Sequence, residues 1–218
     1  MSVNSNGYIH LGGNIRNIYI LLLLSLLTPG WGQVFYENFD DGDLDGSWSL
    51  GGELSIEFSE GVNGTIYSLH LIGSVAEPDD EGLAPDEGLN INLYESQPTY
   101  VSFYIKPKID REYYAESYFV LTNYDENESN PMKNMNWLYV NDEVCGYLTF
   151  FLGGPNSTCY PYPINQNWYF HEFRNINFES QTFDWYVNGE LIASSKPFSY
   201  DVASINMLRL FNYYDELG

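Results

Sequence analysis

Apolar and polar residues alternate along most of the chain after residue 33. In YVSFYI, the apolar Val101, Phe103 and Ile105 are separated by more polar positions, and TFDWYV follows the same period. A period of two places successive side chains on opposite faces of a strand, so the pattern predicts β-strands. Further strands are predicted at LNINLY, ESYFVLTNY, NWLYVN, CGYLTFFL, NWYFHEFRNINF and INMLRLFNY. No segment carries a helical stripe.

Turn signals separate these strands at the spacing of a sandwich. Asn63-Gly64 joins ELSIEFSEGV to TIYSLHLIG, and Asn188-Gly189 joins TFDWYV to ELIASS. Asn-Gly accepts the two positive φ angles of a type I′ turn, so both pairs predict hairpins. The polar stretches 76–88 and 123–134 are predicted to be exposed loops. We therefore expect an all-β, jelly-roll-like sandwich of two antiparallel sheets.

The first 33 residues differ from the rest of the chain. They contain no acidic residue and one Arg, and an apolar run from Ile18 to Leu27 precedes the small residues Gly30 and Gly32. This order predicts a secretory signal peptide over 1–33, cleaved next to Gln33, and a single sandwich domain over 34–218. A retained membrane anchor is the alternative, but the apolar run is about ten residues shorter than a span.

Charge restricts the partners of the predicted domain. Residues 34–218 hold all 30 acidic residues and seven of the eight basic ones, which gives a formal charge of −23. A surface so negative repels nucleic acid and anionic lipid, so we expect neither as a partner and no membrane insertion of the mature domain. We expect a secreted or cell-surface protein whose partner is a glycan or a cell-surface molecule.

Cys145 and Cys159 are the two cysteines of the chain. In a secreted protein two cysteines most simply form one disulfide, which here would contribute roughly 3 kcal/mol by closing a short loop. Two free thiols are the alternative.

Three stretches together resemble a known family. They are FYENFDDGDLDGSW, TYVSFYIKP followed by ESYFVL, and NWYFHEFRNINFESQTFDWYVNGELIA. They resemble the concanavalin A-like lectin/glucanase superfamily, particularly its laminin G-like members. The last stretch carries most of the similarity, with a Trp-led strand, a strand ending in Tyr-Val-Asn-Gly and a return strand. The family's final strand has no counterpart after Tyr213, and a fragment of a longer protein is one explanation.

The resemblance includes glycosidases, but the chemistry they need is not visible. Laminarinase-type members carry Glu-x-Asp-x-x-Glu on one strand, and no such spacing occurs in this chain. In ELSIEFSE, Glu60 falls on the opposite strand face from Glu53 and Glu57, so these three acids cannot flank one bond together. His70 and His171 occur in no recognisable catalytic context, so we interpret each as structural or exposed. We predict no catalytic residues and no required cofactor.

Aromatic residues make up 17% of the chain. A sugar ring has an apolar face and a polar rim, so aromatic rings beside polar groups are a common way to hold a glycan. We take Trp137, Tyr139, Tyr160 and Tyr162 as candidate ligand-binding residues, the last two in a Pro-rich exposed loop. Trp168 and Trp185 are expected in the core, because strands favour aromatic residues there.

The leading functional hypothesis is a secreted, non-catalytic, lectin-like module. A structural or adhesive domain without sugar specificity is the first alternative, and a glycoside hydrolase or lyase of the same fold is the second. One sandwich hosts many activities, so the fold alone does not choose among them.

An acidic turn is the candidate metal site. Asp41, Asp43 and Asp45 alternate as in the calcium loop of an EF-hand, but the twelfth position is Gly52 and Glu53 comes one step late. The flanking segments also have the period of strands, which excludes an EF-hand. What remains is a calcium site of another geometry or a solvated acidic turn.

Calcium binding at this turn, or at the second acidic loop of Asp79, Asp80 and Glu81, would raise the melting temperature. An ion that binds only the folded state stabilises it, and it would relieve the repulsion between crowded carboxylates. Thermal unfolding in millimolar calcium, compared with a chelator at equal ionic strength, measures the effect. Identical melting temperatures would show that both are acidic loops without an ion.

Overall fold

The computed structural model divides into two compact units, Met1–Val34 and Phe35–Gly218. In the first unit β1 (Ser2–Val3) pairs with β2 (Ile9–His10), and most of the predicted signal peptide lies outside the described residues. None of the described residues belongs to a helix with the length and hydropathy of a membrane span. The structure describes residues 2–3, 9–10, 39, 48–51, 55–62, 67–72, 88–107, 114–140, 145, 149–163 and 167–215.

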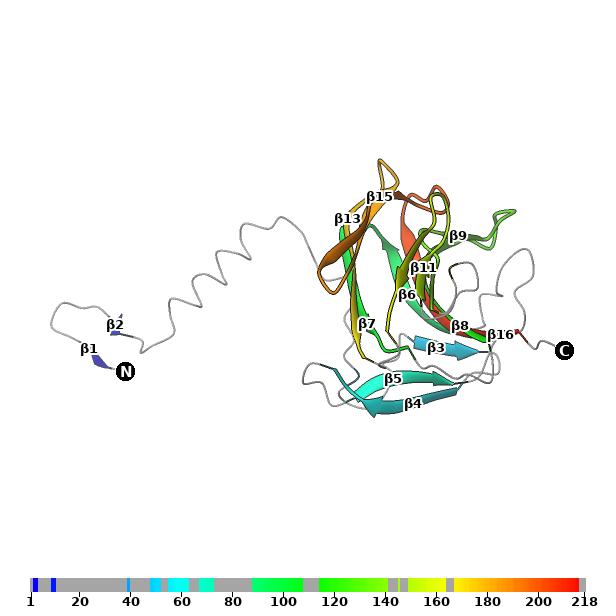
Figure 1. Cartoon of the computed structure of the whole chain (residues 1–218). Coiled ribbons are helices and arrows are strands. Elements are labelled where there is room, and N and C mark those ends of the chain that lie inside the picture. Colours follow the sequence, from blue (N-terminus) through cyan, green and yellow to red (C-terminus); the bar gives the residue numbers. More distant parts are fainter. Residues whose placement is uncertain are drawn as a thin grey trace. The chain divides into compact units, whose positions relative to one another are not determined.

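Two antiparallel sheets form the second unit, which confirms the predicted all-β sandwich (Figure 1). In spatial order the larger sheet contains β12 (Thr158–Pro161), β11 (Thr149–Leu152), β10 (Leu138–Val140), β8 (Tyr114–Tyr124), β16 (Ile205–Asp215), β6 (Gly88–Ser96) and β3 (Trp48–Gly51), with β9 (Met132–Asn134) beside β8. The smaller sheet contains β15 (Glu190–Pro197), β14 (Thr182–Val187), β13 (Tyr169–Asn177) and β7 (Tyr100–Ile105). A separate hairpin consists of β4 (Ser55–Glu60) and β5 (Tyr67–Ile72).

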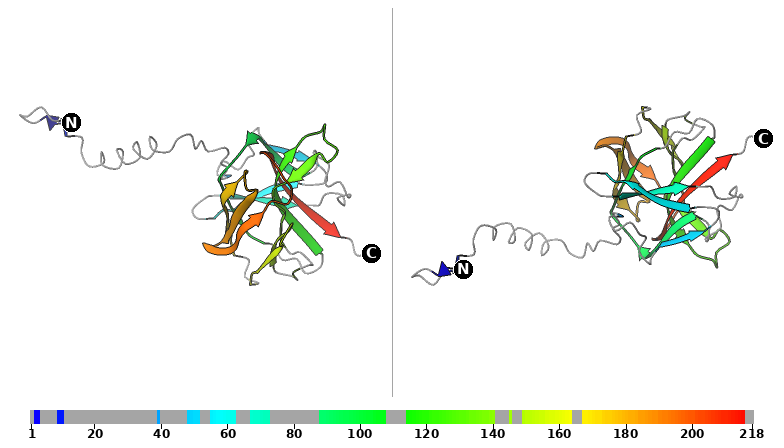
Figure 2. Two further views of the ribbon diagram at one scale, coloured as in Figure 1. Left: turned by 90° about the horizontal axis from the view of Figure 1, so that it is seen from above. Right: turned by 90° about the horizontal axis from the view of Figure 1, so that it is seen from below.

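The chain passes repeatedly from one sheet to the other. It leaves the larger sheet after β6 for β7 and returns at β8, then leaves again after β12 and returns at β16. Strands that are far apart in the sequence therefore become neighbours: β8 and β16 lie side by side in both views of Figure 2. This crossing pattern is what closes two sheets around one core.

Aromatic rings from both sheets fill the space between them. Phe103 of the smaller sheet stacks on Phe119 of the larger one with ring centroids 3.6 Å apart. Phe173, Trp185 and Phe150 are fully buried around this contact. Rings of this size bury more apolar area than any other side chains, so they dominate the stability of the sandwich.

Both predicted hairpins form. β14 and β15 pair across Asn188 and Gly189, whose φ angles of 50° and 82° are those of a type I′ turn. β4 and β5 pair as expected across Asn63-Gly64, although the turn itself lies outside the described residues.

The predicted disulfide is also present. Cys145 and Cys159 are bonded, with their Cα atoms 6.0 Å apart and a sequence separation of 14, and the bond ties Cys145 to edge strand β12, which contains Cys159.

Three sequence expectations about local structure are wrong. The stretch 123–134 is an exposed connection only in its middle, because Asn123 and Tyr124 end β8 and Met132–Asn134 pairs with them as β9. The predicted Pro-rich loop contains β12, whose Pro161 sits on a sheet edge, where the missing N–H is tolerated. Trp168 is only partly buried and lies against Lys106, outside the core where it was expected.

Two glycines with positive φ provide a matched stability test. Gly189 has no neighbour within 4 Å of an added Cβ, whereas a Cβ on Gly154 would lie 2.6 Å from Ser199 Oγ. Gly189→Ala should therefore lower the free energy of unfolding by about 1 kcal/mol through backbone strain alone. Gly154→Ala should cost more, because the clash adds to the strain. Urea denaturation measures both, and equal losses would contradict the clash.

Candidate functional site

The outer face of the larger sheet carries a row of aromatic side chains. Strand pairing places Phe151 opposite Tyr139, Tyr139 opposite Tyr118, and Tyr118 opposite Phe211. Their chain neighbours Phe119, Leu138 and Phe150 point into the core. Because successive residues of a strand face opposite sides, these four rings share the outer face. We call Phe151, Tyr139, Tyr118 and Phe211 the aromatic row.

Rings of the aromatic row contact one another across four strands. The centroid of Tyr118 lies 4.4 Å from that of Phe211 and 4.6 Å from that of Tyr139, and Tyr139 lies 5.4 Å from Phe151. Phe151 and Phe211 are buried, whereas the two central tyrosines are half-buried. The centre of the row therefore presents partly accessible rings held by their neighbours.

Trp137 extends this surface. Its ring stacks near Tyr139 at 6.1 Å and meets Tyr118 edge-on at 6.3 Å, and it is half-buried. Gly153 makes room for the cluster, because an added Cβ there would lie 3.1 Å from the Tyr139 ring and 3.4 Å from Trp137 Cβ. The two predicted ligand-binding residues Trp137 and Tyr139 are thus brought together, as one side of a three-ring surface with Tyr118.

A polar group borders the aromatic row. Arg209 is two residues before Phe211 on β16 and is buried, with its Nε donating to Asn90 Oδ1 at 3.0 Å and its guanidinium 5.9 Å from the Phe211 ring. The sulfur of Met132 accepts from the same guanidinium. These contacts fix a cation and an amide beside the rings in one arrangement.

Tyr160 and Tyr162 belong elsewhere. Tyr160 packs against the core from β12, with its ring 6.5 Å from that of Phe150. Tyr162 is 4% exposed and lies 4.6 Å from the same ring, and its burial raises the pKa of its hydroxyl. The predicted exposure of Tyr162 is wrong, because the chain after β12 turns inward, and we remove Tyr160 and Tyr162 from the ligand-binding set.

The candidate metal residues are not among those the structure describes. Asp41, Asp43, Asp45, Asp79, Asp80 and Glu81 all fall in segments outside the described ranges. Within the described part of the chain, no group of three or more His, Cys, Asp or Glu side chains is arranged to hold a metal ion. Calcium binding stays a prediction.

His171 is a structural residue of the core. It is fully buried between Phe103 and Phe150, at centroid distances of 5.3 and 4.4 Å, and its Nδ1 accepts from Trp185 Nε1 at 3.3 Å. Nδ1 is therefore unprotonated and the proton is on Nε2, which has no hydrogen-bond partner among the residues that the structure describes. Desolvation lowers the pKa of His171 to about 3, so the ring is neutral and out of reach of a substrate.

Sequence reasoning missed Tyr118, Phe211 and Arg209. Their outward direction follows from the alternation in ESYFVLTNY and INMLRLFNY, but their proximity to Trp137 depends on strand pairing over long separations. Alternation gives the face of a strand and says nothing about its neighbours.

No family model matches the chain, and no curated protein matches its sequence. Among solved structures, one titled "Sialidase" is similar over 82% of this chain, with 12% sequence identity and a TM-score of 0.38. The chain spans 14% of that protein's length. At this TM-score the similarity assigns neither a family nor an activity.

His171 should make the fold sensitive to acid. Its pKa is lower in the folded chain than the ordinary 6.5, so its contribution is complete above pH 6.5 and is lost as pH falls toward 3. His171→Phe removes this titration. The free energy of unfolding of the wild type should fall more steeply between pH 6.5 and 4, by up to about 1.4 kcal/mol per pH unit relative to the variant. Urea denaturation across that range measures both, and parallel curves would contradict the assignment.

Proposed function

We propose that the chain is a secreted, non-catalytic, lectin-like module that binds carbohydrate on the outer face of the larger sheet. The observation that carries this proposal is the convergence of Trp137, Tyr139 and Tyr118 into one partly accessible surface. Trp137 and Tyr139 are also the candidates that the sequence predicts. The third comes from a neighbouring strand.

The geometry suits a pyranose ring. An aromatic ring offers an apolar surface to the C–H face of a sugar, and contact removes water from both. Mutual packing and Gly153 hold the rings in place, so little side-chain freedom is lost on binding. Asn90 and Arg209 are buried beside Phe211 and bonded to each other, so they support the row and do not contact a ligand. With a formal charge of −22 the chain repels anionic glycans at long range, so a neutral glycan is the expected class.

Two other functions remain as alternatives. An adhesive domain would use the same exposed rings against a protein, because tyrosine, tryptophan and arginine are the residues enriched at protein interfaces. A glycoside hydrolase or lyase would need carboxylates directed at a bound sugar, whereas the four residues of the aromatic row supply rings and phenolic hydroxyls.

Binding should depend on the rings of the candidate site. Trp137→Ala and Tyr139→Ala should each weaken binding to the glycans selected on a neutral glycan array by about tenfold or more, since loss of about 1.4 kcal/mol of stacking and burial gives a factor of ten. Titration calorimetry with the best array ligand measures the change.

Tyr200→Ala is the matched control, because Tyr200 is exposed and lies in the connection between β15 and β16, outside every strand. It should bind as the wild type does. The adhesive function would replace the lectin proposal if two results are obtained. The glycan array gives no signal, and the chain captures a cell-surface protein that Trp137→Ala no longer captures.

A further inference from the structure

The outer face of the smaller sheet carries a second set of aromatic side chains. Pairing of β7 with β13 places Tyr104 opposite Phe170 and Tyr100 opposite Arg174. These side chains point away from the core, because their chain neighbours on β7 and β13 pack into it, and the rings of Tyr104 and Phe170 are in contact. Trp168 continues the same face beside Lys106, and Tyr186 of β14 lies next to Arg174. We call Tyr100, Tyr104, Trp168, Phe170 and Tyr186 the aromatic stripe.

Exposure on this face is unusual for the molecule. Tyr100, Tyr104 and Leu191 are 48%, 37% and 48% exposed, and they are three of the six large apolar side chains that are exposed among the described residues. Leu191 is opposite Tyr186 in the sheet, so it belongs to the same surface. Contiguous exposed apolar side chains mark binding surfaces more often than single ones do.

A tightly organised ion pair lies within the stripe, at and beside its Tyr100 end. Arg174 donates through Nε and Nη2 to the two carboxylate oxygens of Glu172, at 3.1 and 2.6 Å, and the Tyr100 hydroxyl donates to Glu172 Oε1 at 2.9 Å. The guanidinium also lies 4.1 Å from the centroid of the Tyr186 ring. Bidentate pairing and stacking fix this group before any ligand arrives.

Charge on this face is balanced, unlike that of the chain as a whole. Lys106 and Arg174 offset Glu172 and Asp184, whereas the complete chain carries a formal charge of −22. Asp184 accepts from Asn175 Nδ2 and from the Ser195 amide, each at 2.7 Å. A ligand that matches this surface electrostatically is uncharged and can exchange hydrogen bonds with a carboxylate, a guanidinium and phenolic hydroxyls.

The length of the stripe indicates an extended ligand. Tyr100 and Tyr104 are four residues apart on one strand, which corresponds to about 13 Å. That span exceeds one sugar ring; Glu172 lies opposite Ser102, between the two tyrosines, and Arg174 lies opposite Tyr100. A linear chain of linked sugars can stack on the end rings while its hydroxyls contact the centre.

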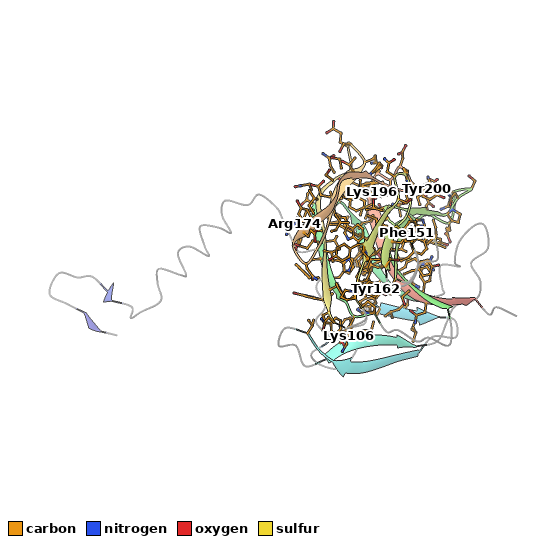
Figure 3. The ribbon with its side chains drawn as sticks, in the orientation of Figure 1. Lys106, Phe151, Tyr162, Arg174, Lys196 and Tyr200 are labelled. Atoms are coloured by element: carbon orange, nitrogen blue, oxygen red, sulfur yellow. A yellow bond between two sulfur atoms is a disulfide. The ribbon has the colours of Figure 1, made fainter. Side chains whose placement is uncertain are left out.

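We propose that the outer face of the smaller sheet binds a linear, uncharged polysaccharide through the aromatic stripe. This surface is separate from the aromatic row, because the two lie on opposite outer faces of the sandwich; Figure 3 labels Arg174 of one and Phe151 of the other. The proposal does not depend on sugar binding at the aromatic row. A second copy of the chain is a poorer occupant, since each copy brings the same large negative charge.

Sedimentation with insoluble polysaccharides tests the proposal on the full chain. The probes are microcrystalline cellulose, insoluble β-1,3-glucan and insoluble mannan, with cross-linked polygalacturonate as the charged comparison. We expect binding to at least one neutral probe and none to polygalacturonate. Tyr100→Ala and Tyr104→Ala should each raise the apparent Kd about three- to tenfold, the factor expected for loss of one ring contact. Tyr104→Trp should retain binding.

Control variants separate this surface from the aromatic row. Tyr200→Ala should bind the neutral probe as the wild type does, and thermal unfolding verifies that every variant is folded. Absence of binding to all three neutral probes overturns the proposal, as does unchanged binding by both Tyr100→Ala and Tyr104→Ala. Loss with Trp137→Ala alone assigns the ligand to the aromatic row. A dimer in solution that Tyr104→Ala dissociates shows an interface between copies in place of a polysaccharide site.

Discussion

Contact between aromatic rings of opposing sheets is the interaction on which the sandwich depends. Phe103 stacks on Phe119 at 3.6 Å, and Phe150 meets the edge of His171 at 4.4 Å, so rings from β7 and β13 interlock with rings from β8 and β11. Strand geometry then directs every neighbouring residue outward. Tyr104 is outward because Phe103 is inward. Both aromatic surfaces of the protein are consequences of the same inward packing.

The sequence was sufficient for the architecture where local signals are strong. Alternation predicted β7 and β14, and the φ angles of Asn188 and Gly189 are those an Asn-Gly hairpin requires. Local signals were weak where a strand is short or contains proline. For that reason the segment of β12 was predicted to be a loop. Without a predicted strand, the sequence could not show that Tyr160 points toward the core. Pairing partners supply what the local sequence of such strands lacks.

Candidate sites were harder to predict than the fold, because they combine strands that are distant along the chain. Trp137 and Tyr139 are two residues apart in the sequence and could be selected together, whereas Phe211 joins them only through the pairing of β8 with β16. Aromatic residues on both faces add a second ambiguity. Trp168 and Trp185 both lie in aromatic-rich segments, yet Trp185 is fully buried and Trp168 is partly exposed. When the residues on both faces of a strand are apolar, the sequence pattern cannot show which ring points into the core.

The two outer faces differ in how their polar groups are held, and this difference bears on what each can bind. At the aromatic row, Arg209 is buried and donates to Asn90, which lies opposite it on β6 and fixes its position. At the aromatic stripe, Arg174 is held from the side by Glu172 and by the face of Tyr186, and part of it stays in contact with solvent. A guanidinium whose charge is already paired attracts anions weakly but can still share hydrogen bonds with hydroxyl groups. This arrangement is the physical basis for proposing a neutral, hydroxyl-rich polymer at the stripe, since the net charge of the chain disfavours acidic ones.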